Sequence, residues 1–277
     1  MDLSPPYLEK IYQYRPLVSF PGKNLWHNSG FKLETTMSIK LRDALALALP
    51  ALLSACALLP KAPTAKNTLK TFKTVVVDAG HGGKDSGAYR RSGPPEKIVT
   101  LDVAKRLEQK LRESQLKTVM TRSSDVFISL DERVEIENSK KNSIFVSIHF
   151  NDSRRRGIHG FETYYHSPNS SELAERIQSK LMTIPNSMNR GVHFANFRVL
   201  RLATYPAVLV ECGFLSNRRE GKEARDSEYR ELLADKIAEA IVEIRYGPGV
   251  YRAAETTSAQ TPDSSGPGLV PSTLRRE

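Results

Sequence analysis

Two histidines and two glutamates have the side chains and the positions that metal-assisted catalysis requires. His81 lies in the glycine-rich run DAGHGG, His149 in SIHFN and Glu211 in VECGF, and Glu96 precedes an amphipathic segment. Two histidines and a carboxylate form a typical catalytic zinc shell, in which a fourth position stays open for water. We therefore predict that His81, Glu96 and His149 bind Zn²⁺.

The fourth residue of the set, Glu211, would then be the general base. Zinc lowers the pKa of its bound water from about 16 to about 7, and a carboxylate that does not bind the metal can accept the proton. Two neighbouring residues have roles that the sequence leaves open. Asp78 either orients His81 through a hydrogen bond or caps a turn, and Asn151 either contacts the substrate or satisfies the loop.

Other catalytic patterns fit the chain less well. A phosphate-binding loop requires Ser or Thr after G-K, where this chain has Asp85. Ser114 begins the run SQLK, which matches the S-x-x-K motif of penicillin-binding proteins, but the accompanying K-T-G is absent. A second, penicillin-sensitive peptidase site at Ser114 stays an open alternative. Cys212 lies in an apolar run without a histidine beside it, which favours a packed cysteine over a nucleophile.

The apolar patterning places these residues on alternating strands and helices. Short β-branched or alternating runs predict strands, and apolar residues that recur every three or four positions predict helices. The predicted strands are 75–77, 116–121, 143–149, 160–165, 198–201 and 207–212. The predicted helices begin at Glu96, span 130–141, follow Ser170 or Ser171, and run from 232 to 244. This alternation predicts one α/β domain over residues 72–246, with the candidate ligands at the carboxyl ends of strands.

Several segments, in the same order, resemble the zinc-dependent N-acetylmuramoyl-L-alanine amidases of bacterial cell walls. They are VVVDAGHGGKDSGA, the helix start Glu96-Lys97, SIHFN, Arg190-Gly191-Val192 followed by FRVLR, and PAVLVECGFLSN. The resemblance implies a mixed sheet of about six strands with helices on both faces. It also implies the same three ligands and the same base. The reaction it implies is hydrolysis of the amide between N-acetylmuramic acid and the L-alanine of the stem peptide.

The resemblance also bears on regulation. Relatives that act in cell separation often carry a long helical insert after the SIH segment, which blocks the zinc. Only about twenty residues separate His149 from the helix predicted near Ser171, which leaves no room for that insert. We therefore expect an enzyme that such a helix does not inhibit, and the sequence does not identify an activator protein.

Length and composition exclude several classes of protein. The chain has 277 residues, of which 39% are hydrophobic and 26% charged, a composition typical of globular proteins. Two cysteines are too few for a disulfide framework. The net charge of +10 suits nucleic acid, anionic lipid or an acidic polymer such as the cell wall. Because the basic residues are scattered and cluster only at Arg154–Arg156, we expect no nucleic acid as partner. The resemblance implies peptidoglycan instead.

The N-terminal part has the pattern of an export signal. Met37 begins a short positive region, an apolar stretch follows, and the run LSAC ends at Cys56. LSAC resembles the lipobox of bacterial lipoproteins, whose cysteine becomes lipidated. We therefore expect a mis-called extension at 1–36, a signal peptide at 37–55 and a tether at 56–71.

The sequence as a whole predicts an exported peptidoglycan hydrolase. A lipid on Cys56 would anchor it to a membrane on the periplasmic side, and Ala57 after the cysteine favours the outer membrane. Residues 247–277 are small and polar, which predicts a disordered tail. The alternatives are a zinc peptidase that cuts within the stem peptide and a wall-binding lipoprotein without catalysis.

Overall fold

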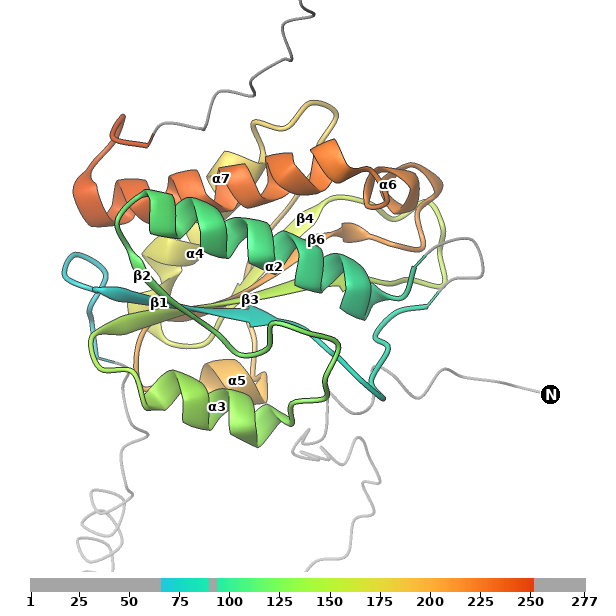
Figure 1. The fold of residues 1–277 in the computed structure, drawn as a ribbon. Coiled ribbons are helices and arrows are strands. Elements are labelled where there is room, and N and C mark those ends of the chain that lie inside the picture. The colour runs from blue at the N-terminus through green and yellow to red at the C-terminus, as the bar shows by residue number, and fades with distance from the viewer. Residues whose placement is uncertain (1–65, 90–93, 252–277) are drawn as a thin grey trace, which may run out of the picture.

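The structure, a computed structural model, describes residues 66–89 and 94–251. Within these ranges six strands form one sheet with helices on both faces (Figure 1). The strands are β1 (Thr74–Ala79), β2 (Lys117–Met120), β3 (Ser143–Asn151), β4 (Phe161–Tyr165), β5 (Asn189–Phe194) and β6 (Ala207–Phe214). The helices are α2 (Glu96–Glu113), α3 (Leu130–Asn138), the 3₁₀-helix η2 (Pro168–Ser170), α4 (Ser171–Leu181), α5 (Arg198–Arg201), α6 (Arg218–Glu223) and α7 (Ser227–Tyr246). The predicted export signal lies outside the described residues, as does the predicted tail after residue 251.

The sheet is mixed, and its topology brings four strand ends to one side. The strand order is β2-β1-β3-β6-β4-β5. Strands β1, β2, β3 and β6 are parallel, β4 runs antiparallel to β6, and β5 runs parallel to β4. Residues at the ends of β1, β3 and β6 therefore meet at one edge, here called the carboxyl edge. The opposite edge, where these strands begin, is called the amino edge.

Alternation of side chains along the strands divides the core into two parts. On one face, residues such as Val77 and Ile148 pack under α2, α4 and α7. On the other face, residues such as Val76 and Phe145 pack under α3 and α5. Farther along the same strands this second face becomes polar, with Asp78, Ser147, His149 and Glu211. The two small helices thus cover its amino half and leave its carboxyl half to polar groups.

The structure corrects one predicted strand. Residues 198–201, predicted as a strand, form helix α5, and the sixth strand is β5, which the apolar pattern did not reveal. Val199 and Leu200 are adjacent and both buried, which a helical turn permits but alternating strand side chains do not. β5 is an edge strand with half-exposed, mostly polar residues, so it shows no alternating apolar signal.

The domain extends beyond its predicted boundaries. Leu69, predicted to lie in the tether, is buried in the core, and the Thr68 hydroxyl donates to the Ser143 carbonyl at 2.7 Å. At the other end, the Tyr251 hydroxyl donates to Asp235 at 2.7 Å, so Tyr251 of the predicted tail is packed against the domain. Strands β3 and β6 each run two residues past their predicted ends. None of the helices in the described ranges has the length and apolar character needed to cross a membrane.

Glu137 is a buried carboxyl group without a hydrogen-bond partner in the described ranges. Its side chain on α3 is fully buried, and neither oxygen is bonded. Burial and, secondarily, the charge of Asp78 raise the pKa of Glu137 well above its ordinary value of 4.5. The folded protein therefore keeps a proton here that the unfolded chain releases as the pH rises.

We predict that Glu137→Gln flattens the pH dependence of stability. Between the ordinary pKa of glutamate and the raised pKa of Glu137, the unfolded chain binds fewer protons at this position than the folded protein. The wild-type free energy of unfolding therefore falls by up to about 1.4 kcal/mol per pH unit in that range. The free energy of unfolding of the glutamine variant should not fall in this way, because glutamine does not titrate. Urea unfolding over this pH range, with a chelator present, measures the difference, and Glu135→Gln on the exposed side of α3 is the control. Parallel curves for Glu137→Gln and wild type would contradict the prediction.

Candidate metal centre

Three side chains from separate elements converge at the carboxyl edge. His81 lies in the loop after β1, Glu96 is the first residue of α2, and His149 lies near the end of β3. Their potential ligand atoms all lie within 4.8 Å of one another. Oε1 of Glu96 is 3.0 Å from Nε2 of His81 and 3.1 Å from Nδ1 of His149. The structure thus brings together the three residues that were predicted as ligands.

The two imidazole rings have different electrostatic surroundings. Burial lowers the pKa of His81, but Glu96 and a hydrogen bond to Asp85 outweigh burial and raise that pKa to about 10. Burial lowers the pKa of His149. Burial alone would raise the pKa of Glu96, yet the two histidines hold it far below its ordinary value. A cation at this position would therefore meet a carboxylate that is already ionised.

The donor set fits a divalent transition metal. Imidazole nitrogens and a carboxylate oxygen are the ligands that zinc prefers at catalytic sites. Nδ1 of His81 contacts a carboxylate oxygen of Asp85 at 2.9 Å, which leaves Nε2 directed towards Glu96. Carboxylates commonly orient metal-binding histidines in this way. This role of Asp85 was not predicted, although its position four residues after His81 in a glycine-rich loop was a usable signal.

Two glycines allow the backbone to approach these side chains closely. A Cβ atom on Gly80 would lie 2.4 Å from the ring of His149. A Cβ atom on Gly87 would lie 2.6 Å from Oε2 of Glu96 and 2.7 Å from the ring of His81. Cβ atoms in proteins essentially never make contacts this short, so a larger residue at either position must displace a candidate ligand.

The loop that carries His81 has a strained backbone that two buried arginines hold in place. His81 has a φ of +61°, a conformation that costs a non-glycine residue about 1–3 kcal/mol. Arg133 donates to the carbonyl oxygens of Ala79 and His81 at 2.8 and 2.7 Å. Arg122 donates to those of Ala79 and Gly80 at 2.9 and 2.8 Å. Three successive carbonyl groups are thereby fixed, and the loop cannot relax without breaking buried bonds.

Asp78 holds one of these arginines, Arg133, and thereby helps to fix the loop. Its carboxylate accepts hydrogen bonds from the hydroxyl groups of Thr121 and Ser147, at 2.6 Å each, and from Arg133. These partners outweigh burial, so the pKa of Asp78 lies below its ordinary value. The carboxylate that contacts Nδ1 of His81 is that of Asp85. Asp85, and not Asp78, is therefore placed to take the orienting role that the sequence left open for Asp78.

Glu211 faces the three converging side chains from the next strand. It is paired with His149 in the β3–β6 register, and paired positions point to the same face. Its Oε2 is buried and has no hydrogen-bond partner within the described ranges. Burial, then the charges of Glu96 and Glu162, raise the pKa of Glu211 well above its ordinary value. An unsatisfied buried carboxyl oxygen is costly, so this oxygen is available to bond a group that the chain does not supply.

Glu162 lies directly opposite Glu211 on the antiparallel strand, and three donors surround its carboxylate. The Asn151 amide, the Tyr164 hydroxyl and Nε of Arg190 donate to the Glu162 carboxylate at 2.8, 2.7 and 2.5 Å. Like charges opposite each other destabilise a sheet unless other groups compensate them, and these three donors supply that compensation. The side chain of Asn151 bonds to Glu162 within the protein. The substrate contact considered for Asn151 stays a prediction. Glu162 was not predicted as a site residue, because no local motif surrounds it.

The remaining sequence candidates lie elsewhere. Cys212 is a buried free thiol whose pKa is raised by burial, as expected of a packed cysteine. Ser114 follows the last turn of α2 at the amino edge, and its hydroxyl donates to the Lys110 carbonyl at 2.9 Å. That bond is ordinary at a helix end and gives no support to a peptidase site there. Cys56 lies outside the described residues.

Comparison with known proteins places these residues in a family. Residues 75–243 match the family model described as N-acetylmuramoyl-L-alanine amidase. The chain belongs to this amidase family. The matched range includes β1 from Val75 onward, the other five strands and every residue of the candidate metal centre.

Individual amidases agree with this assignment. N-acetylmuramoyl-L-alanine amidase LytC of Bacillus subtilis is 40% identical over 174 residues, which are 61% of this chain and 35% of LytC. The chain thus spans about a third of the length of LytC. The catalytic domain of the amidase CwlV from Bacillus (Paenibacillus) polymyxa var. colistinus is 39% identical, with a TM-score of 0.60, and the match covers 62% of this chain and 97% of that one.

A third similar structure is that of the CwlD amidase from Clostridioides difficile, determined in complex with the GerS lipoprotein. It is 31% identical with a TM-score of 0.59, and the match covers 62% of this chain and 98% of that one. The likeness to both solved structures covers nearly all of those chains, so it concerns a complete amidase domain.

We predict that Gly80→Ala weakens Zn²⁺ binding by at least about ten-fold, the lower end of what disturbed ligand support usually costs. The reason is the displacement of His149 by the added Cβ atom. Competition with a chromophoric chelator measures the affinity, and circular dichroism verifies the fold. Gly157→Ala is the matched control, because nothing lies within 4 Å of its added Cβ atom. Equal affinities of the two variants would show that the close approach is unimportant.

Proposed function

We propose that the protein is a zinc-dependent peptidoglycan amidase that cleaves the bond between N-acetylmuramic acid and the L-alanine of the stem peptide. The observation that carries the proposal is the convergence of His81, Glu96 and His149 beside Glu211 in a domain of the amidase family. The chain would hold zinc through two nitrogen ligands and one oxygen ligand, a set that is typical of catalytic sites that also bind water.

In this proposal the metal, the general base and the residues that position His81 have separate roles. Zinc, when bound, supplies Lewis acidity that lowers the pKa of water and polarises a carbonyl group. Glu211 would accept a proton from the attacking water and pass it to the departing amine of L-alanine as the amide bond breaks. Its register opposite His149 and its unsatisfied Oε2 support this role. Asp85, Arg122 and Arg133 would keep the His81 ring and its loop in place during turnover.

We predict that Glu211→Gln lowers the rate of amide hydrolysis by about 10²–10⁴-fold, the usual contribution of a general acid–base group. The variant keeps its zinc, because Glu211 is not one of the three proposed ligands. The assay incubates the purified protein with muropeptides, with zinc or with a chelator, and identifies the products by mass spectrometry. Metal analysis of the same samples separates loss of the base from loss of the ion.

The product masses also distinguish the alternatives. Intact stem peptide separated from the muramyl sugar, and absent after chelation, supports the amidase. Cleavage inside the stem peptide would instead identify a zinc peptidase. If zinc-loaded protein cleaves nothing, even with a cell-envelope extract added to supply an activator, a wall-binding lipoprotein becomes the better explanation.

We also infer that the protein is an envelope lipoprotein anchored through Cys56, on the strength of the LSAC run and a substrate outside the cytoplasm. Wild-type protein should sediment with membranes and carry an acylated N-terminal peptide, because two or more acyl chains give stable anchoring. Cys56→Ala should lack that mass and should not be processed to residue 56. Unmodified Cys56 in the wild-type protein would refute the anchor, and sucrose-gradient fractionation tests the favoured outer membrane.

A further inference from the structure

The amino edge of the sheet, opposite the metal centre, is lined by basic side chains. The segments that lead into β1, β2, β3 and β6 are residues 66–73, 114–117, 139–142 and 202–206, and they contain no Asp or Glu. They do contain six lysines, here called the lysine edge: Lys66, Lys70, Lys73, Lys117, Lys140 and Lys141. Acidic residues are thus missing from the connections where basic residues gather.

Backbone hydrogen bonds hold these separate segments side by side. The amide of Lys117 donates to the carbonyl of Lys73 at 3.2 Å, and the amide of Lys73 donates to that of Asn142 at 2.9 Å. Nε of Arg245, in the last turn of α7, donates to the carbonyl of Phe72 at 2.8 Å. Basic residues from four parts of the chain therefore share one surface.

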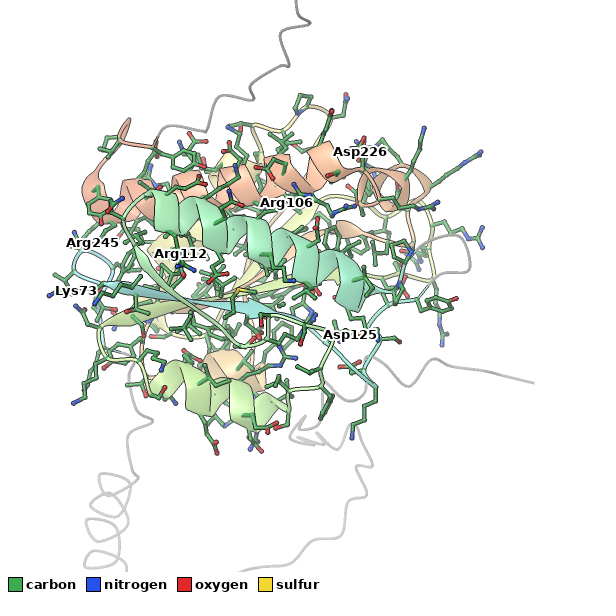
Figure 2. All side chains as sticks on the ribbon, viewed as in Figure 1. Lys73, Arg106, Arg112, Asp125, Asp226 and Arg245 are labelled. Carbon is green, nitrogen blue, oxygen red and sulfur yellow. The ribbon has the colours of Figure 1, made fainter. Side chains whose placement is uncertain are left out.

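The lysine edge and the metal centre lie at opposite ends of the molecule. Figure 2 shows Lys73 and Arg245 close together at one end and Asp125 at the other. Asp125 accepts a hydrogen bond from the amide of Gly83, in the loop that carries His81, at 2.8 Å. A surface that binds the lysine edge would therefore leave the metal centre facing away.

Most of the charge on this edge is not neutralised by the protein. Lys70 pairs with Glu172, whereas the other five lysines form no ion pair with a residue of the described ranges. Four of those five, Lys66, Lys73, Lys117 and Lys141, are exposed. Basic side chains on the helices differ, as Lys180 shows by pairing with both Glu239 and Glu243. Clustered charge without internal partners repels itself, which a polyanionic surface would relieve.

We propose that the lysine edge is a membrane-docking surface that binds the headgroups of anionic phospholipids. Tyr246 and Val250, next to Arg245 at this edge, are 42% and 53% exposed, and side chains of these kinds suit the boundary between headgroups and acyl chains. The described chain also begins here, because the amide of Lys66 donates to the Thr204 carbonyl. Cys56 precedes Lys66 by ten residues, which span at most about 36 Å.

A wall polymer is the weaker choice of partner for this surface. A peptidoglycan substrate has to reach the metal centre, which lies at the carboxyl edge. The proposal goes beyond the amidase function and does not depend on it, since it rests on the position and charge of the lysine edge. It also does not require the lipid on Cys56, although the two would act together.

The test is vesicle binding by the full chain carrying Cys56→Ala, which has no acyl group. Its partitioning is compared between phosphatidylcholine vesicles with and without phosphatidylglycerol, so that any contribution of the apolar residues before Cys56 cancels. The triple variant Lys73→Gln, Lys117→Gln, Lys141→Gln should bind the anionic vesicles about 100-fold more weakly, because each basic residue near such a surface contributes about five-fold. Binding should also weaken as salt is added.

The matched control is Arg154→Gln, Arg155→Gln, Arg156→Gln, which removes the same charge from three exposed residues in the loop that follows β3 at the carboxyl edge. It should bind anionic vesicles nearly as well as the parent. Equal losses in the two triple variants, or no preference for anionic vesicles, would overturn the proposal. So would a lysine variant that keeps vesicle binding but loses binding to purified wall sacculi. The vesicle assay involves no catalysis, so a failed amidase assay would not affect its result.

Discussion

The metal centre depends on a strained loop whose carbonyl groups are held by two buried arginines. His81 adopts a positive φ without being glycine, and this conformation directs its imidazole towards Glu96. Arg122 follows β2 and Arg133 lies on α3, so the loop is fixed only once β1, β2 and α3 have assembled. Buried arginines without partners would be costly. The same bonds therefore satisfy the arginines and prevent the loop from relaxing, which links the stability of this half of the domain to the geometry of the centre.

One face of the sheet serves two purposes because its character changes along the strands. On the face under α3 and α5, β3 presents Phe145, Ser147 and His149 in turn, and β6 presents Leu209 and then Glu211. The apolar members anchor α3 and α5, and the polar members reach the open part of the face. A shift of either strand by one residue would exchange the two faces, burying polar groups under helices and removing Glu211 from its place opposite His149.

The parts of the molecule that could be predicted are those encoded by local patterns. The buried strands β1, β3 and β6 are continuous apolar runs, and the four central residues stand beside their ends or at a helix start. β5 and α5 were not predicted because an exposed edge strand and a four-residue helix carry too little pattern. Arg133 was missed for a different reason. It bonds a carbonyl group 52 positions away, and no spacing in the sequence reveals which of many arginines will be buried beside a loop.

The separation of the two edges has a geometric consequence for an enzyme held at a membrane. β3 runs from one edge to the other in nine residues, which corresponds to about 30 Å of rigid sheet. In the proposed orientation the fold would act as a spacer of fixed height, and the reachable glycan strands would be those at that height above the bilayer. The thickness of the domain, and not only the chemistry of its centre, would then select which layer of the wall is cut.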